Sequence, residues 1–212
     1  MDNTAGSLTQ FQKSVIIGSL LGDAYLRIIP GRKNAFLEFN HSSKQSAYVD
    51  WKFDILKNYC RSKPKLRAYN TRKAYRFFTR SNKEFTNYYH QFYIDGKKVV
   101  PDNLIIDPLS LAVWYIDDGS KCGEDNVYLN TQQFTISDQT KLQSILLEFG
   151  IISRLNSDKK YFRIRIQKKS IDKFFSLISS YIIPSFRYKL GYDPVETCSE
   201  HNNRTNIDLI SV

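Results

Sequence analysis

Two stretches of the sequence decide the fold: Ile16-Ile-Gly-Ser-Leu-Leu-Gly-Asp-Ala24 and Leu111-Ala-Val-Trp-Tyr-Ile-Asp-Asp-Gly119. Each is an apolar segment that ends in an acidic residue followed by a small one. Apolar segments of about ten residues are too short to span a bilayer and are typical of buried helices. A carboxylate at the end of such a helix must be paired, bound to a metal ion or open to solvent. Because Asp23 and Asp118 occupy matching places, the two stretches predict a shared polar site.

The composition favours a globular protein that binds nucleic acid. The 212 residues carry a formal net charge of +10, and 42% of them are hydrophobic. This charge indicates a polyanionic partner, although a basic protein that is merely soluble is the alternative. The 14 Tyr and 14 Phe residues exclude a disordered basic tail as a description of the whole chain. The three cysteines (Cys60, Cys122 and Cys198) form no CxxC pair, so they indicate neither a disulfide scaffold nor a zinc knuckle.

The N-terminal residues 1–7 show neither a basic segment followed by an apolar one nor an Arg-rich transit peptide. We therefore expect no membrane association and a protein that works where it is made. That compartment would be an organelle (mitochondrion or chloroplast) if the gene is organelle-encoded, and the cytoplasm otherwise.

The same order of elements follows each of the two stretches. Alternation and turn residues predict strands, and wider apolar spacing predicts helices. In the first half we expect a hairpin over 25–40, a helix over 46–60, a basic hairpin over 61–80 and a helix through 92. In the second half we expect a strand over 127–135, a helix over 137–149, a basic hairpin over 151–169 and a helix over 170–183. An internal duplication of this kind predicts an α+β protein of two pseudo-twofold related repeats, 1–104 and 105–191, followed by a C-terminal tail, 192–212.

The two apolar stretches differ in their glycines. Gly18 and Gly22 lie one helical turn apart, and glycine is unfavourable inside a helix, so the pair indicates that another backbone packs closely there. The matching positions of the second stretch are Val113 and Asp117. We therefore expect approximate rather than exact symmetry.

If the two helices pack side by side about a twofold axis, Asp23 and Asp118 become neighbours. Two close carboxylates repel each other or share a proton unless a cation lies between them. Mg²⁺, for which Mn²⁺ can substitute, suits such oxygen ligands. The ion can activate water and stabilise a leaving alkoxide. A twofold substrate such as double-stranded DNA could then present one phosphate to each acid.

The predicted hairpins could read DNA, because strand ribbons fit the major groove. Their side chains mix hydrogen-bond donors and acceptors, whereas a surface for phosphates alone would need mostly Lys and Arg. The candidate DNA-binding residues are Tyr25, Arg27, Glu38, Asn40, Arg76, Arg80, Asn130, Gln132, Arg163 and Arg165.

The two quoted stretches resemble the sequence motif of the LAGLIDADG homing endonucleases, in their two-motif, single-chain form. The resemblance extends from about residue 9 to residue 190. It implies two αββαββα repeats that pack through the motif helices, with antiparallel sheets that form a DNA-binding saddle. It also implies a monomer that acts as a pseudo-dimer.

The resemblance further implies which residues act. The metal ligands would be Asp23 and Asp118, assisted by the backbone carbonyls of Gly22 and Asp117. Basic residues near the metal would come from 97–101 and 184–190, and the candidates there are Lys98 and Lys189.

The implied activity is hydrolysis of both strands of a long, specific double-stranded DNA site, which leaves short 3′ overhangs and promotes intron homing. Both acids are present, although Leu21 stands where the family consensus has its earlier Asp. Two alternatives remain open on the same fold. One is an RNA-binding maturase that assists splicing of an intron RNA, and the other is a DNA-binding regulator that does not cut. The intact acids favour cleavage.

Overall fold

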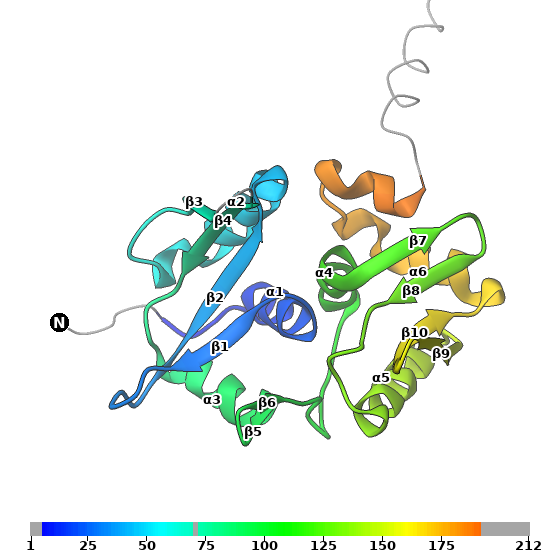
Figure 1. Ribbon diagram of the computed structural model, residues 1–212, viewed down its shortest axis with the longest axis horizontal. Helices are drawn as coiled ribbons and strands as arrows, with labels where there is room; N and C mark the ends of the chain where they lie inside the picture. The colour runs from blue at the N-terminus through cyan, green and yellow to red at the C-terminus, as the bar shows by residue number, and fades with distance from the viewer. Residues whose placement is uncertain (1–5, 70–71, 192–212) are drawn as a thin grey trace, which may run out of the picture.

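Two helices, α1 (Gln10–Leu21) and α4 (Pro108–Asp118), lie side by side at the centre of the molecule (Figure 1). In this computed structural model, residues 6–69 and 72–191 are described. The α1 helix is capped by Thr9, which forms a capping box with Gln12. The α4 helix begins after Asp107, whose carboxylate accepts the backbone N–H of Ser110, and proline occupies the first helical position.

The first half adds a four-stranded antiparallel sheet and two more helices to α1. The sheet order is β1-β2-β4-β3, and α2 and α3 pack on the sheet. The elements are β1 (Tyr25–Ile28), β2 (Ala35–Ser42), α2 (Ser46–Leu56), β3 (Lys65–Tyr69), β4 (Arg72–Phe78) and α3 (Lys83–Phe92).

The second half repeats this arrangement around α4. Its sheet order is β7-β8-β10-β9, which matches the first sheet strand for strand, and α5 packs against it. The elements are β7 (Gly119–Cys122), β8 (Asn126–Leu129), α5 (Ile136–Glu148), β9 (Ser153–Asp158), β10 (Tyr161–Ile166) and α6 (Ile171–Ile178). The predicted α+β class with two αββαββα repeats is thereby confirmed.

A short segment joins the two halves. A small hairpin of β5 (Tyr93–Ile94) and β6 (Lys97–Lys98) follows α3, and residues 99–107 then lead to α4 without a helix or strand. A 3₁₀ helix, η5 (Pro184–Leu190), packs beside β7 at the end of the described chain. Among the described helices, none is long and apolar enough to cross a membrane.

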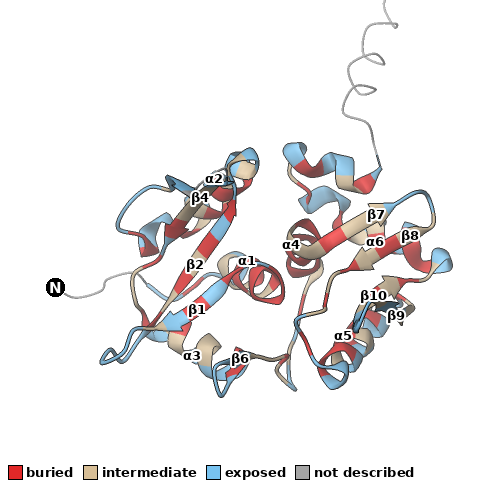
Figure 2. Ribbon diagram, in the orientation of Figure 1, coloured by how far each residue is buried: buried red, intermediate tan, exposed pale blue. Residues whose placement is uncertain are grey.

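The strands alternate between a buried face and an open face, as Figure 2 shows for β2. Leu37 and Phe39 are fully buried, whereas Glu38 and Asn40 lie on the opposite face. This period of two is the one that a half-buried strand requires. Since α2 and α3 cover the buried face, the polar positions of β2 belong to the face that remains free for a partner.

The central helices approach each other closely at the two glycines of α1. A Cβ atom built on Gly18 would lie within 3.0 Å of the carbonyl oxygen of Ser110 and of Val113 Cβ, and one on Gly22 would lie within 3.0 Å of Asp117 Cβ. Glycine is needed at both positions because a side chain would have to occupy space that α4 fills. The expected close approach of the two helices is therefore present, and only α1 contributes glycines to it.

The structure corrects the expected strand over 127–135. The strand β8 ends at Leu129, and residues 130–134 form a turn that leads into α5. The repeat pattern requires a strand before β8, but no residues were assigned to this strand, β7, because Gly-Ser-Lys-Cys lacks the branched and aromatic residues that favour strands. The expected helix over 46–60 ends its α-helical part at Leu56. The predicted tail, 192–212, lies outside the described residues, and the repeat boundary at 104 stays a prediction.

Candidate active site

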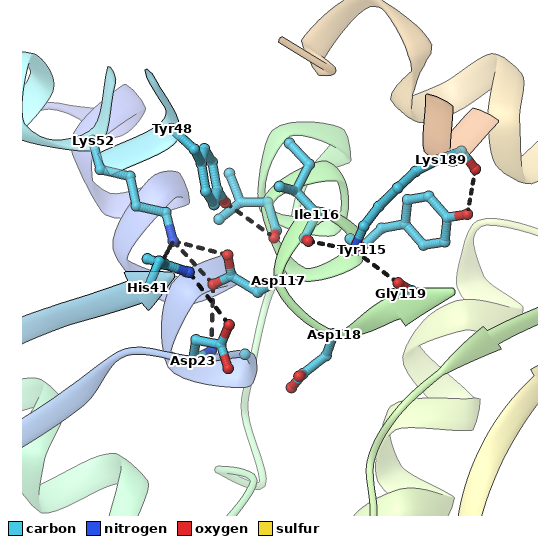
Figure 3. Close-up of polar contacts among 12 residues, drawn as sticks. Asp23, His41, Tyr48, Lys52, Tyr115, Ile116, Asp117, Asp118, Gly119 and Lys189 are labelled. Carbon is cyan, nitrogen blue, oxygen red and sulfur yellow. Dashed lines mark hydrogen bonds and ion pairs between the residues drawn. The ribbon is translucent and has the colours of Figure 1, made fainter. Parts of the chain in front are cut away.

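The carboxylates of Asp23 and Asp118 lie at the same end of the central helix pair (Figure 3). Asp23 follows Gly22, the C-cap of α1, and Asp118 is the last residue of α4. Both line an open hollow of about 390 Å³ between the two halves. The other lining residues are Gly22, Ala24, Tyr25, Lys98, Asn130, Gln132 and Gln133. The fold therefore brings the two predicted acids to one site.

The two acids resist ionisation. Burial, followed by the charge of Asp117, raises the pKa of Asp23 to about 6, although 46% of its side chain is still exposed. Burial, followed by the charge of Asp23, raises the pKa of Asp118 to about 7. Both shifts have the direction expected of carboxylates that lose water and face one another. A cation in the hollow would remove this conflict.

The two predicted lysines occupy equivalent places at the ends of the central helices. Lys98 Nζ donates to the carbonyl oxygens of Gly22 and Ala24, at 2.9 Å each. Lys189 Nζ donates to the carbonyl oxygens of Ile116 at 2.6 Å and Gly119 at 2.8 Å. Each ammonium thus lies where free carbonyls and the helix dipole favour a positive charge.

Burial lowers the pKa of Lys98 to about 8 and also lowers the pKa of Lys189, while the nearby aspartates oppose the shift. Both lysines therefore join the acids in one cluster, as expected. The carbonyl of Gly22 already accepts a hydrogen bond from Lys98, which makes it a weaker candidate for metal binding than the carboxylates.

The side chain of Asp117 points away from the hollow and into the first half. Lys52 Nζ, from α2, lies 2.9 and 3.0 Å from the two carboxylate oxygens of Asp117, and neither side chain has exposed surface. His41 Nε2 lies 3.4 Å from Lys52 Nζ, and His41 Nδ1 lies 3.5 Å from a carboxylate oxygen of Asp23. Burial, followed by the charge of Lys52, lowers the pKa of His41 to about 4. Asp117 is thus an ion-pair partner of Lys52, and only its carbonyl remains a candidate ligand.

Sequence reasoning missed Lys52 and His41, although a signal for each was present. Lys52 lies four residues from both Tyr48 and Leu56, on the apolar face of α2, where a charge needs a partner. His41 continues the buried alternation of β2. Gln133 was also missed. It lies in the turn after β8, with Nε2 3.3 Å from the carbonyl of Leu21 and 3.5 Å from Asp118 Oδ2.

Most of the candidate DNA-binding residues of the first half share the open face of its sheet. Tyr25 pairs with Glu38 across β1 and β2, and Asn40 pairs with Arg76 across β2 and β4. Glu38 lies 3.6 Å from Arg27 and 3.9 Å from Arg76. Arg80 differs from this group. It lies beyond the end of β4, and its guanidinium donates to the carbonyl of Asn58 at 3.0 Å.

In the second half the candidates come from two different elements. Arg163 and Arg165 lie on β10, and the guanidinium of Arg163 stacks on Tyr128 with 3.9 Å to the ring centre. Asn130 and Gln132 lie on the turn after β8 and not on a strand, which corrects the expectation. They nevertheless line the hollow beside Asp118. Asn130 accepts from Arg163 at 3.3 Å, and Gln132 donates to Asp158 at 2.8 Å.

The donor set suits a hard divalent cation. Ligand atoms of Asp23, His41 and Asp117 all lie within 4.8 Å of one another. Lys52 already pairs with both oxygens of Asp117, however, so this trio is not free to bind a metal. The remaining carboxylates, Asp23 and Asp118, offer oxygen ligands to an open hollow, and oxygen ligands are what Mg²⁺ and Mn²⁺ prefer.

The chain is similar to known proteins over most of its length. A model of the LAGLIDADG DNA endonuclease family matches residues 13–174. The cytochrome b mRNA maturase bI2 of Debaryomyces hansenii is 30% identical over 190 residues, which cover 84% of this chain and 72% of that protein.

Two solved structures extend the comparison. The homing endonuclease I-WcaI bound to its DNA recognition sequence is 27% identical, with a TM-score of 0.82 and 89% of each chain covered. I-DmoI in complex with DNA and Mn is 15% identical, with a TM-score of 0.52, and covers 82% of this chain and 98% of that chain, a likeness of fold alone. The family model covers well over half of the chain and includes both motif stretches, 16–24 and 111–119. The chain belongs to the LAGLIDADG DNA endonuclease family.

Proposed function

We propose that this protein is a site-specific homing endonuclease that hydrolyses both strands of a long double-stranded DNA site and promotes intron homing. The observation that carries the proposal is the pair of carboxylates, Asp23 and Asp118, one from each repeat, in a single hollow between two sheets. The net charge of +10 supports a polyanionic substrate. The likeness to I-WcaI, solved on its DNA recognition sequence, supports the same substrate class.

In this proposal Asp23 and Asp118 hold Mg²⁺, with Mn²⁺ as a substitute, and the carbonyl of Asp117 is a further candidate ligand. The two carboxylates that line one open hollow support divalent metal use. A bound divalent ion would supply an activated water and stabilise the leaving alkoxide. Each acid serves one scissile phosphate, and cleavage leaves short 3′ overhangs.

The lysines have a separate role. Lys98 and Lys189 are held by the carbonyls at the ends of the motif helices, beside the acids. Their ammonium groups stabilise negative charge that develops on the phosphate, at positions fixed before the substrate arrives.

The two sheets position the DNA. The open faces carry Tyr25, Arg27, Glu38, Asn40 and Arg76 in one half and Arg163 and Arg165 in the other, with Asn130 and Gln132 closer to the acids. We propose that these residues contact bases or phosphates. Arg80 is the weakest candidate because it already donates to Asn58.

The proposal is tested on a plasmid that carries the uninterrupted allele of the host gene. Wild-type protein with Mg²⁺ should linearise this plasmid and leave a scrambled-site plasmid intact, and EDTA should abolish cutting. End sequencing should find 3′ overhangs. Specific binding without any cutting in Mg²⁺ or Mn²⁺ would overturn the proposal in favour of a DNA-binding regulator.

A second candidate function is supported by one observation, the 30% identity to a cytochrome b mRNA maturase. A maturase would bind intron RNA and assist its splicing, and an organelle-encoded gene would suit both roles. The test is splicing of the host intron with wild-type protein and with Asp23→Asn. Splicing stimulated equally by both proteins would show an RNA role that does not use the carboxylates, and no stimulation would exclude it.

A further inference from the structure

The two halves of the site are connected to the rest of the protein differently. Asp117 in α4 occupies the position that matches Gly22 in α1. Its Oδ2 accepts the backbone N–H of Asp23 at 3.3 Å, across the interface between the halves. The second motif helix therefore contributes a side chain to the first half-site. Gly22 has no side chain with which to return this contact.

The space between the helices allows only one such side chain. A Cβ atom on Gly22 would lie within 3.0 Å of Asp117 Cβ and Oδ2. A residue larger than glycine at position 22 would thus push Asp117 out of its place. The asymmetry is built into the helix contact and does not depend on a flexible surface group.

The carboxylate of Asp117 is itself held firmly. Both of its oxygens pair with Lys52 Nζ, and the two side chains have no exposed surface. A buried pair of this kind has little freedom, because either charge left alone would be unpaired in a medium of low polarity. His41 extends the cluster from Lys52 to the carboxylate of Asp23. Asp23 is thus held at its backbone N–H, and His41 lies beside its carboxylate.

We propose that Asp117, held by Lys52, is a positioning residue for Asp23 and not for Asp118. The inference rests on the proposed endonuclease function. It assigns to a residue of the second motif the task of fixing the backbone of the first acid, so that the two strands are cut under the control of different groups. Loss of the acceptor at position 117 should therefore slow one strand more than the other.

The experiment compares two double variants from which the buried charges have been removed. Lys52→Met with Asp117→Asn keeps an oxygen that can accept the Asp23 N–H. Lys52→Met with Asp117→Ala removes it. Replacing a buried ion pair by neutral groups is often tolerated, and urea unfolding verifies that both variants fold. Asp102→Asn, an exposed change of the same chemistry, is the matched control.

Cutting is measured in single turnover on a duplex with a different label on each strand. The strand that depends on Asp23 is defined as the one that Asp23→Asn slows more. The Asp117→Ala double variant should change the ratio of the two strand rates at least tenfold, against that strand, and the Asp117→Asn double variant should restore it to within about threefold of wild type. Calorimetric titration of the DNA complexes with Ca²⁺ should show at least tenfold weaker binding at one site in the Asp117→Ala double variant alone.

An unchanged strand ratio in the Asp117→Ala double variant would overturn the inference, as would equal slowing of both strands by Asp23→Asn. Equal Ca²⁺ binding by the two double variants would also overturn the inference. If wild-type protein cuts neither strand, the proposed function fails instead, and the Ca²⁺ titration alone then decides the positioning role.

Discussion

The two half-sites have the same reacting groups, but different residues hold those groups in place. Each has one aspartate at the end of a motif helix and one lysine on the carbonyls of that helix. Asp23 borders a buried cluster of Lys52, His41 and Asp117, whereas the carboxylate of Asp118 accepts a hydrogen bond from Gln133, on a turn. The duplicated fold thus fixes the positions of the reacting groups, while the residues that hold them have diverged.

The largest difference between the halves should appear in stability. Lys52→Met leaves Asp117 as an unpaired buried charge, and we expect a loss of about 3–5 kcal/mol in the free energy of unfolding. The second change, Asp117→Asn, should recover most of it. Lys141→Met, in the matching helix α5, removes partly exposed ion pairs with Asp102 and Asp138 and should cost about 0.2–1 kcal/mol for each. Urea unfolding of all three variants measures this. Equal losses of unfolding free energy for Lys52→Met and Lys141→Met would contradict the expected difference between the halves.

Because both halves have a lysine in the same place, substituting either lysine should slow cutting by a similar factor. Removal of one preorganised donor to developing charge typically costs about 10²–10³ in rate. We expect losses of this size, and of similar size, for Lys98→Met and Lys189→Met in single-turnover cutting. DNA affinity should change far less, since each lysine contributes one of many charges. A variant that cuts at the wild-type rate would exclude that lysine from the site.

Substitution of a glycine in α1 should have a smaller effect on stability. Gly18→Ala places a methyl group against Ser110 and Val113, and overpacking of this kind costs about 1–3 kcal/mol. Gly6→Ala, where the structure has open space, is the control and should stay within about 0.5 kcal/mol of wild type. Thermal unfolding of both variants provides the comparison. A stable Gly18→Ala protein would show that the helices are less tightly apposed than described.

The smallest effect concerns pH. The folded-state pKa values of Asp23 and Asp118 are raised to about 6 and about 7, so the folded protein binds more protons than the unfolded chain between pH 4 and 7. Ionising these acids therefore removes stability as pH rises. Without metal, Asp118→Asn should gain melting temperature relative to wild type as pH increases to 8, by about 2–4 °C per kcal/mol recovered. The gain for Asp23→Asn should develop about one pH unit lower. Parallel pH profiles of wild type and both variants would contradict the shifts.

Much of the fold and part of the site could be predicted from the sequence. The motif helices and both acids follow from local patterns, and the positions of Lys98 and Lys189 follow from the family resemblance. The strand β7 was missed because its short polar sequence has weak strand preference, and its stability comes from pairing with β8. The expected strand over 127–135 was also too long, because β8 ends at Leu129, so Asn130 and Gln132 lie in the turn and not on a strand.

The Lys52–Asp117 pair could not be predicted from local sequence patterns, for a different reason. The two residues belong to different halves, and their contact depends on how closely the helices approach. Lys52 could have been recognised as a charge on an apolar helix face. Its partner could not, because the space that Gly22 leaves for Asp117 is a property of the packed interface.

The central claim is that one acid from each repeat carries out cleavage. Single-turnover cutting of a strand-labelled duplex in Mg²⁺ by wild type, Asp23→Asn and Asp118→Asn tests it most directly. Each substitution keeps the size of the side chain but removes the charge that would hold a divalent cation. We predict that wild type cuts both strands and that each variant binds the duplex but loses at least about 10³-fold of its rate on one strand. Cutting of both strands by either variant within tenfold of the wild-type rate would contradict the claim.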